Sequence, residues 1–553
     1  MKGGTMKKIL LVLCLALMAT SLFAMPMSPE LKQQLIEQGR YDAVTQILIQ
    51  AKSRGVDSPN PHAFRHIPGR TDTLKAIAIM VDFSDNVGVT PIAHYDSILS
   101  SLGTYSTGSF RDYYLENSYG EVDIIMTVVG WLRMPQTYAY YVNGQNGFGN
   151  YPQNCQKLTE DAVLAANPSV DFSQFDNDGD NYIDALFIIH AGPGAEDTGD
   201  PNDIWSHAWV TSNVPYVDGV WAYHYSTEPE NGKIGVFCHE AGHSLFGLED
   251  LYDYDYDSYG AGMWTVMAFG SWGNGGLRPV HFDGRCKIQC GFLSPQVPNS
   301  NQTGVEFPRV EYNPIVYKLW TNGAPANEFF VVENRQKVGF DNYLPASGMF
   351  IYHVDENQSG NDNQWYPGHT SSGHYLLAVE QADGQWHLEK YVNSGTGADP
   401  YPGSLNKRFF NDSTTPDSKN YLFNATYVAV ENISDSGDTM TADIKVTNTG
   451  IEEVVNFAAQ IPRFKISPTI AQTQFKILFA ANSGYGSSRL VIYNTAGSLV
   501  KSFNDLNSNQ IIWYGDDDQG NRVSPGVYFV KLIRDSPGEA SNVIRPEKII
   551  LIE

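Results

Sequence analysis

Basic residues are scarce in this sequence. Its 553 residues include 36 Lys and Arg against 61 Asp and Glu, which gives a formal net charge of −25 and a pI of about 4.8. A surface of this sign repels phosphate backbones and anionic membranes. We therefore expect no nucleic-acid partner.

Long apolar runs are also missing, apart from one near the N-terminus. Lys7 and Lys8 precede an apolar run over residues 9–18, and small residues then lead to Ala24. This order predicts a secretory signal peptide over residues 1–24, with a run too short to cross a bilayer. No other stretch predicts a transmembrane segment. We expect a secreted or cell-surface protein that has no membrane span after signal removal.

Cysteine is rare as well. One of five lies in the predicted signal peptide, which leaves Cys155, Cys238, Cys286 and Cys290. Export permits disulfides, and four cysteines allow three full pairings among which the sequence does not choose. Cys286 and Cys290 would pair poorly on one helix.

The most informative motif that is present is HExxH, at residues 239–243. On a helix, His239 and His243 lie on the same face, where two imidazoles can hold one Zn²⁺. Glu240 then faces the open side of the metal and can deprotonate a zinc-bound water. The alternative is a helix that carries two surface histidines and a glutamate.

The residues after the motif favour a metal site. Gly247 follows the apolar helix and predicts a C-terminal cap, because only Gly adopts the left-handed conformation cheaply. A turn there can bring an acidic side chain back to the metal. Met267 lies in an apolar run that leads to a Gly-rich turn, as in the methionine turn beneath metzincin zinc sites. Alternatively, this run is a core strand in which Met267 fills a gap.

With these features the sequence resembles the immune inhibitor A type of secreted zinc metallopeptidases, over about residues 73 to 445. The resemblance rests on an ordered series of segments: 78–83, 117–122, the aspartate cluster at 176–184, 247–253, 270–276 with Pro279 and His281, 332–336 and 348–356. It implies a zinc-dependent endopeptidase that hydrolyses extracellular proteins or peptides, with Glu240 as the base. Tyr252 and His281 are candidate donors to the oxyanion.

The chain departs from the family pattern at one position. Three residues separate His243 from Gly247, where the family has two, because of Phe246. Counting from Gly247 makes Asp250 the third zinc ligand, and counting from the first histidine makes it Glu249. We prefer Asp250 and expect Phe246 to form a helix bulge.

Apolar runs predict buried strands at 74–83 and 185–190, and a second metal site is predicted in the loop before the second strand. Asp176, Asp178, Asp180 and Asp184 alternate around Gly179, and such oxygen-rich turns bind Ca²⁺. A solvated acidic turn is the alternative. A bound calcium ion would have a structural role.

The chain divides by composition into several predicted parts. Residues 25–72 predict a helical, propeptide-like segment and linker, whose lack of cysteine excludes latency through a thiolate. Residues 73–298 predict an α+β zincin domain of metzincin-like type, with its active-site helix at 236–245. Strands and turns predict a β-sandwich at 299–450 and an immunoglobulin-like β-sandwich at 455–553.

The last predicted domain resembles the C-terminal sorting domains of type IX secretion. That resemblance implies contact with an export machinery and surface delivery in a Gram-negative cell. A different function remains open on the sequence: a non-catalytic surface adhesin or binding protein that uses a zincin scaffold to display its β domains. The intact Glu240 argues against it.

Overall fold

The computed structural model describes residues 25–369 and 373–448, and in the C-terminal part 465–467, 469–478, 487–504, 506, 510–535, 542–543 and 547–552. The predicted signal peptide at 1–24 lies outside the described residues. The chain forms two compact units, Met1–Asn448 and Thr449–Glu553. Within the described part, no helix is both long and apolar enough to cross a membrane.

A mixed sheet organises the first half of unit one. Its strand order is β2-β1-β3-β7-β4, with bounds β1 (Asp72–Asp82), β2 (Val122–Arg133), β3 (Leu186–His190), β4 (His207–Val210) and β7 (His224–Pro229). β1 pairs in parallel with β2 and β3, and β3 with β7. β4 is antiparallel to β7 and forms one edge of the sheet. The buried strands predicted at 74–83 and 185–190 are confirmed as β1 and β3.

Helices pack on this sheet. The longer ones are α4 (Phe110–Asn117), α6 (Cys155–Ala166) and α8 (Ile234–Phe246). Ser109 and Asp112 form a reciprocal capping box that starts α4. The short elements are α3 (Ile92–Tyr95), η1 (Asp96–Ser100), α5 (Tyr138–Val142), η2 (Phe172–Phe175), α7 (Ala195–Thr198), η3 (Gly262–Trp264), η4 (Phe269–Trp272), α9 (Gly284–Gln289) and the hairpin β5 (Tyr216–Val217) with β6 (Val220–Trp221).

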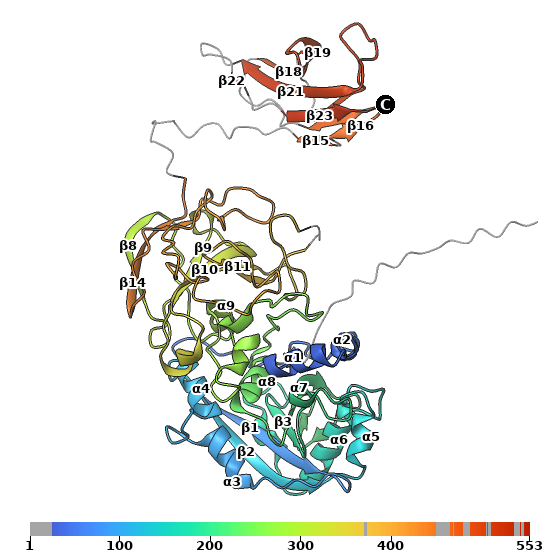
Figure 1. The fold of residues 1–553 in the computed structure, drawn as a ribbon, viewed down its shortest axis with the longest axis vertical. Helices are drawn as coiled ribbons and strands as arrows, with labels where there is room; N and C mark the ends of the chain where they lie inside the picture. The colour runs from blue at the N-terminus through green and yellow to red at the C-terminus, as the bar shows by residue number, and fades with distance from the viewer. Residues whose placement is uncertain are drawn as a thin grey trace, which may run out of the picture. The chain divides into compact units, whose positions relative to one another are not determined.

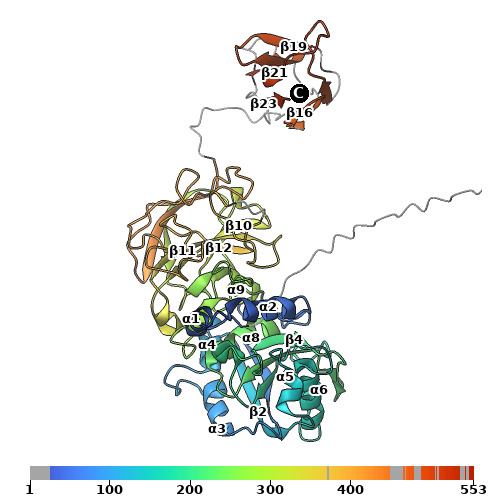
Figure 2. The ribbon, with the colours of Figure 1, turned by 45° about the vertical axis from the view of Figure 1, so that its right-hand side comes forward.

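The propeptide-like segment forms two helices in the structure, α1 (Pro29–Glu37) and α2 (Tyr41–Lys52). Ser28 caps α1, and Gly39 with a positive φ separates the helices. Met25, Met27, Leu31 and Leu35 are buried in the same core as the sheet. Figures 1 and 2 show both helices lying against the domain that carries the HExxH motif, and α1 contacts α7.

Two further sheets complete unit one. One has the order β12-β11-β10-β9 and the other β13-β14-β8. Their bounds are β8 (Gln302–Pro308), β9 (Tyr317–Leu319), β10 (Glu328–Arg335), β11 (Gly348–Asp355), β12 (Leu377–Val379), β13 (Ala429–Glu431) and β14 (Thr439–Lys445), with η5 (Thr321–Gly323) and η6 (Gly339–Tyr343) between them. Phe330 and Val332 share one core with Met440 and Ile444 of the facing sheet. These strands lie within residues 299–450, where the sequence predicts strands and turns.

The other face of β10 and β11 packs on the first half of the unit. Val331 and Phe350 belong to the core that contains α8 and the five-stranded sheet. Both faces of these strands are therefore covered, which explains why β11 is buried along its whole length. The two halves are joined through a packed interface and belong to one compact unit.

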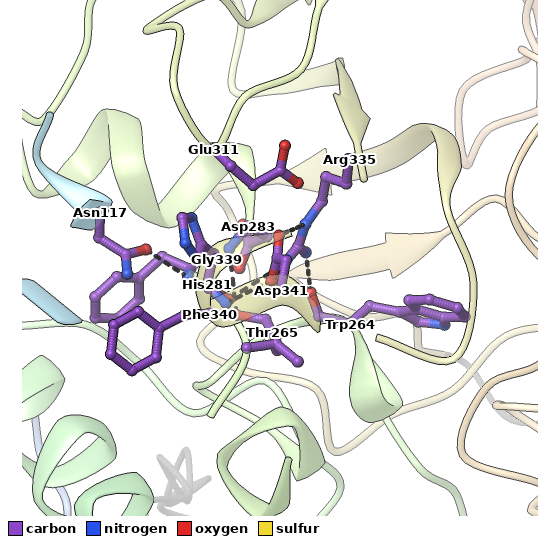
Figure 3. A network of polar contacts seen from close by, with 12 residues as sticks. Asn117, Trp264, Thr265, His281, Asp283, Glu311, Arg335, Gly339, Phe340 and Asp341 are labelled. Atoms are coloured by element: carbon purple, nitrogen blue, oxygen red, sulfur yellow. Dashed lines mark hydrogen bonds and ion pairs between the residues drawn. The ribbon is translucent and has the colours of Figure 1, made fainter. Parts of the chain in front are cut away.

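A buried polar network crosses the same junction (Figure 3). The guanidinium of Arg335, at the end of β10, donates to both oxygens of Asp341 at 2.9 and 2.7 Å. It also donates to the carbonyl oxygen of Trp264, in the loop before Met267. Asp341 in turn accepts from the backbone N–H of His281 at 2.8 Å. Arg335 thus ties the second half of unit one to the turn before Met267.

Unit two also contains two sheets, β15-β17-β20 and β16-β23-β21-β18-β19, with β22 pairing to β21. Its strands are β15 (Lys465–Ser467), β16 (Ile470–Ala471), β17 (Phe475–Leu478), β18 (Ser487–Asn494), β19 (Leu499–Phe503), β20 (Gln510–Trp513), β21 (Gly526–Asp535), β22 (Asn542–Val543) and β23 (Glu547–Leu551). Side chains from both sheets, among them Phe475, Trp513 and Val530, form one core. The immunoglobulin-like character of this unit stays a prediction.

Cys155, Cys238, Cys286 and Cys290 are buried and free in the structure. None of the disulfide pairings that the sequence left open is formed. Burial raises the pKa of the Cys155 thiol, so this group is a neutral, apolar core residue. The described part of the chain is held together by packing and polar contacts without cross-links.

Candidate metal centre

The HExxH motif lies on α8, which is buried along its whole length. The helix remains regular through Phe246, so the expected bulge does not form and the extra residue simply lengthens the helix. Gly247 then adopts φ 60°, and the N–H of Leu248 donates to the carbonyl of Gly242 at 3.0 Å. Gly247 thus ends the helix in the left-handed conformation, and the chain turns back toward the histidines.

Three side-chain atoms converge at that turn. His239 Nε2 lies 3.3 Å from His243 Nε2. Asp250 Oδ1 lies 2.9 Å from the first of these nitrogens and 3.2 Å from the second. All three side chains are fully buried. The structure therefore brings together the two predicted histidines and the preferred third residue.

The hydrogen bonds of the two imidazoles fix which nitrogen faces the centre. His239 Nδ1 lies 2.8 Å from the carbonyl oxygen of Val266, and His243 Nδ1 lies 2.7 Å from that of Leu248. A carbonyl oxygen can only accept, so each Nδ1 carries the hydrogen and each Nε2 turns its lone pair inward. Outer partners of this kind orient metal-binding histidines.

The converging donors suit a cation. Two imidazole nitrogens and a carboxylate oxygen within 3.3 Å of one another need positive charge among them, either a proton or a metal ion. Burial lowers the pKa of His243, but the Asp250 carboxylate outweighs it and the pKa is raised to about 9. The pKa of Asp250 is held well below its usual range, by the neighbouring His243 and His239 against the opposing effect of burial. Two imidazoles and one carboxylate are donors that Zn²⁺ accepts, so the residues fit that ion.

Glu240 is also fully buried on α8. Neither of its carboxylate oxygens has a hydrogen-bond partner among the described residues. Burial raises its pKa well above the usual range, and the nearby carboxylates of Asp57, Glu228 and Asp250 raise it further. A basic group held without partners next to the converging donors is poised to exchange a proton.

Glu249 takes a different position from Asp250. Its Oε2 accepts from Arg285 Nη1 at 2.9 Å, and the same guanidinium also binds Glu356 at 2.8 Å. The carboxylate of Glu249 does not belong to the group of converging donors. The ion pair with Arg285 accounts for an acidic residue at this position, so no metal is needed to explain it.

Met267 lies beneath the centre, in a turn and not in a strand. It is fully buried, and its carbonyl oxygen accepts from the N–H of Leu251 at 2.8 Å. The neighbouring Val266 supplies the carbonyl that orients His239. The loop around Met267 thus positions both the first histidine and the returning segment after Gly247.

The two candidate oxyanion donors lie in different places. The ring of Tyr252 lies 6.3 Å from that of His239, and its buried hydroxyl has no hydrogen-bond partner among the described residues. The imidazole of His281 instead contacts Glu116 at 2.8 Å and Lys287 at 3.0 Å, and its backbone joins the Arg335 network (Figure 3). Tyr252 stays a candidate, whereas His281 has a structural role.

One residue at the centre was missed by sequence reasoning. Asp57 follows α2, and one of its oxygens, an oxygen of Glu240 and a ring nitrogen of His243 all lie within 4.8 Å of one another. Asp57 has a left-handed φ of 55°. It belongs to no motif, and only the long-range packing of the propeptide-like segment brings it here.

Tyrosines of the loop after Asp250 contact this same segment. Tyr256 accepts from the N–H of Met27 at 3.1 Å, and Lys32 Nζ lies 2.9 Å from the Tyr259 hydroxyl. Lys52 Nζ lies 3.2 Å from the centre of the Tyr254 ring. The tyrosine-rich loop therefore forms the surface on which residues 25–52 lie.

The predicted calcium loop is only partly assembled. Carboxylate oxygens of Asp176, Asp178 and Asp180 lie within 4.8 Å of one another. Asp184 lies outside this group, and its Oδ2 accepts from Asn177 at 2.5 and 2.9 Å. Asp180 also contacts His62 at 3.0 Å, so the loop adjoins the segment that precedes β1.

Comparison with known proteins bears on the same region. Residues 63–288 match the family described as immune inhibitor A peptidase M6, catalytic domain. Immune inhibitor A of Bacillus thuringiensis subsp. alesti is 37% identical over 209 residues, 32% of this chain and 30% of the relative. The pre-pro-metalloprotease PrtV of Vibrio cholerae is 28% identical over 345 residues, 52% of this chain and 37% of that protein. The matches thus span about a third of the length of these relatives.

Among solved structures, dimeric latent PorU from Porphyromonas gingivalis shows 17% identity over 23% of this chain and 12% of that one. The TM-score is 0.16, so this likeness carries no argument about the fold or role of either unit.

Proposed function

We propose that this protein is a secreted zinc endopeptidase of the zincin type. The observation that carries the proposal is the convergence of His239, His243 and Asp250 beside the unpartnered carboxylate of Glu240. The match of residues 63–288 to a peptidase family and the metalloprotease among the relatives support the same activity. Proteins or peptides outside the cell are the proposed substrates.

His239, His243 and Asp250 would hold the zinc ion. When bound, zinc supplies a Lewis acid that polarises a carbonyl oxygen and lowers the pKa of water toward about 7. Glu240 takes the proton from the attacking water and later passes it to the leaving amine. Tyr252, whose ring lies 6.3 Å from that of His239, is the proposed donor to the oxyanion.

Casein hydrolysis tests this proposal. The chain would be assayed before and after limited proteolysis in the exposed loop at 67–71, beside Glu240→Gln and the exposed control Glu37→Gln. We expect hydrolysis by the cut wild type and the control, loss by Glu240→Gln, loss with a chelator, and recovery with zinc. Absence of hydrolysis in every form would favour the surface-binding alternative.

Export and calcium binding are further proposals. The predicted signal peptide at 1–24 motivates export, and the resemblance of the C-terminal part to sorting domains motivates contact with an export machinery at a Gram-negative cell surface. The grouping of Asp176, Asp178 and Asp180 supports a structural calcium ion. Each is testable by itself, because none is required for hydrolysis at Glu240.

A further inference from the structure

A cavity of about 120 Å³ lies in the second half of unit one, beside the strands β11 and β12 that Figure 2 labels. His353 of β11 and Val379 of β12 line it, together with residues from the loops at 365–367, 386–389 and 414–423. None of its lining residues is among the converging donors of the metal centre. An apolar cavity of about 150 Å³ holds one benzene molecule. This cavity is therefore of a size for one side chain or one small ring.

Aromatic rings form part of the lining: Trp365, Trp386, Tyr421 and Phe423. The ring of Tyr421 is stacked between two imidazoles, with its centroid 4.1 Å from that of His353 and 3.6 Å from that of His374. The rings of Trp365 and Phe423 are tilted against each other, with centroids 5.7 Å apart. Both faces of Tyr421 are thus covered, and the two indoles and Phe423 remain for contact with a ligand.

Two of these aromatic residues have left-handed backbones. Trp386 has φ 53° and Phe423 has φ 60°. Such values are rare for bulky residues and carry strain, which proteins keep chiefly at ligand-binding and active sites. Phe423 is also 64% exposed, so an apolar ring lies at the surface beside the cavity. Local preferences do not account for the placement of these rings.

Acidic groups outnumber basic ones among the titratable residues of the lining, which are His353, His374, Glu380, Glu389, Asp417 and Lys419. Lys419 Nζ lies 3.0 Å from Asp417 Oδ2, so these two charges balance. The imidazole of His353 lies 3.3 Å from Glu380 and 3.0 Å from Glu328, which is outside the lining. One imidazole thus serves two carboxylates.

Two further basic groups near the cavity have partners of their own. His374 Nε2 lies 2.7 Å from Asp355 Oδ2. Lys390 is not part of the lining. Its Nζ donates to the carbonyl of Gln385 at 2.8 Å and lies 5.6 Å from the centre of the Trp386 ring. Neither group balances the charge of the remaining acid in the lining.

That acid is Glu389, which is only 3% exposed. Its Oε2 accepts from the amide of Gln381 at 2.6 Å, and no cation is paired with it in the described part of the chain. Burial raises the pKa of Glu389 to about 8. Burial also raises the pKa of Glu380, against the opposing effect of His353. A positive charge brought into the cavity would stabilise the ionised form of both carboxyl groups.

We propose that this cavity binds an organic cation of side-chain size, such as the guanidinium group of an arginine. The aromatic rings attract a cation through their faces, and Glu389 and Glu380 supply the opposite charge. A planar guanidinium both stacks on aromatic rings and donates to carboxylates. The net charge of −25 favours the approach of cations. A sugar ring would also stack on the indoles, but it would leave the charge of Glu389 without compensation.

Isothermal titration calorimetry with the full chain tests the need for positive charge. The probes are Nα-acetyl-arginine amide and its neutral isostere Nα-acetyl-citrulline amide. We expect the arginine derivative to bind with a dissociation constant of roughly 1 mM or below, and the citrulline derivative at least about tenfold more weakly. Equal affinities, no binding of either probe, or binding of glucose in their place would overturn the proposal.

Methylguanidinium distinguishes the source of the cation. Weaker binding than that of the arginine derivative would identify a side chain of another protein, and equal binding would identify a small free cation. Both outcomes require the cavity to select positive charge.

Two variants then locate the bound cation, each with a matched control. Glu389→Gln and Trp386→Ala should each weaken binding of the arginine derivative about tenfold. The exposed Glu37→Gln and the partly exposed Trp221→Ala, both outside the lining, should bind like the wild type. Glu389→Gln should leave the weak binding of the citrulline derivative unchanged, which a collapsed cavity would not. Wild-type affinity in both cavity variants would contradict the assignment.

Discussion

The Sδ atom of Met267 lies 2.5 Å from the point that a Cβ on Gly242 would occupy. Gly242 stands between the two candidate ligands of α8, so the sulfur fills the space that the missing side chain leaves. The helix and the turn beneath it are therefore fitted to each other at the centre of the proposed site. A glycine inside a helix is unfavourable by itself, and this contact explains its presence.

Gly242→Ala should destabilise the protein. The added methyl group overpacks the contact with Met267, at a cost of about 1–3 kcal/mol in the free energy of unfolding. Gly437→Ala is the control, because its Cβ would meet nothing within 4 Å. Chemical denaturation measures the free energy of unfolding of both variants. The double variant Gly242→Ala with Met267→Ala should show a smaller loss than the two single losses added together, and strict additivity would argue against the contact.

Asp250→Asn and Glu249→Gln should separate the two candidates for the third ligand. Loss of a direct ligand should weaken zinc binding by more than the roughly 10- to 100-fold typical of an outer partner. We expect that loss for Asp250→Asn only, because Glu249 is engaged by Arg285. The zinc that each variant retains after dialysis against increasing concentrations of a chelator measures the loss of affinity. If Glu249→Gln lost zinc and Asp250→Asn retained it, Glu249 would be the third ligand, as counting from the first histidine predicts.

Arg335→Ala should be among the most damaging changes distant from the site. It leaves Asp341 buried with its main partner removed, which costs about 3–5 kcal/mol of stability. The control is Arg309→Ala, whose partner Asp438 has a side chain that is 76% exposed and whose loss should cost under about 1 kcal/mol. Thermal unfolding measures the stability that each of the two variants loses. Similar losses for both would mean that the network in Figure 3 does not hold the two halves together.

Protonation of His207 should weaken the fold at low pH. Burial lowers the pKa of this imidazole on β4 to about 3, against about 6.5 in the unfolded chain. Between these values the unfolded chain binds a proton that the folded chain excludes, so stability is complete above pH 6.5 and falls as the pH falls. Relative to His207→Asn, the wild type should lose about 1 kcal/mol per pH unit below pH 6.

The exposed His94→Asn provides the control for that series. This exposed substitution should leave the free energy of unfolding close to that of the wild type. Denaturation midpoints at several pH values measure both differences. A flat difference for His207→Asn would mean that the imidazole accepts its proton within the folded state.

Calcium should stabilise the loop at 176–180. If Ca²⁺ binds there, a concentration of about 100 times its dissociation constant raises the free energy of unfolding by about 2.7 kcal/mol. Asp178→Asn should remove most of that gain, whereas the exposed Asp42→Asn should keep it. Thermal unfolding in the presence of Ca²⁺, with Mg²⁺ for comparison, measures this gain in stability. No calcium-dependent shift in the wild type would leave the loop as a solvated turn.

The sequence predicted those features that depend on local order. Helix spacing in HExxH and the cap at Gly247 are short-range properties, and they placed His239, His243 and Asp250 close together. The position of Phe246 misled the prediction, since one extra residue can lengthen a helix as easily as bulge it. His281 and the four cysteines could not be placed from spacing, because their partners and distances depend on tertiary packing.

Asp57 is the clearest case of a residue that sequence could not place. It carries no motif, and it reaches the centre because a distant strand edge, at Ala208, pairs with its backbone. The propeptide-like character of residues 25–72 was visible from their position before the predicted peptidase domain. The point at which this segment touches the site required the fold.

The pairing of residues 25 and 57 with β4 also has a consequence for handling the protein. An uncovered edge strand offers unpaired N–H and C=O groups to any other chain, and folded proteins usually shield such edges. The segment that precedes β1 provides that shield here, at Ser206 and Ala208. A preparation that retains residues 25–72 should therefore be the form least prone to self-association during concentration and storage.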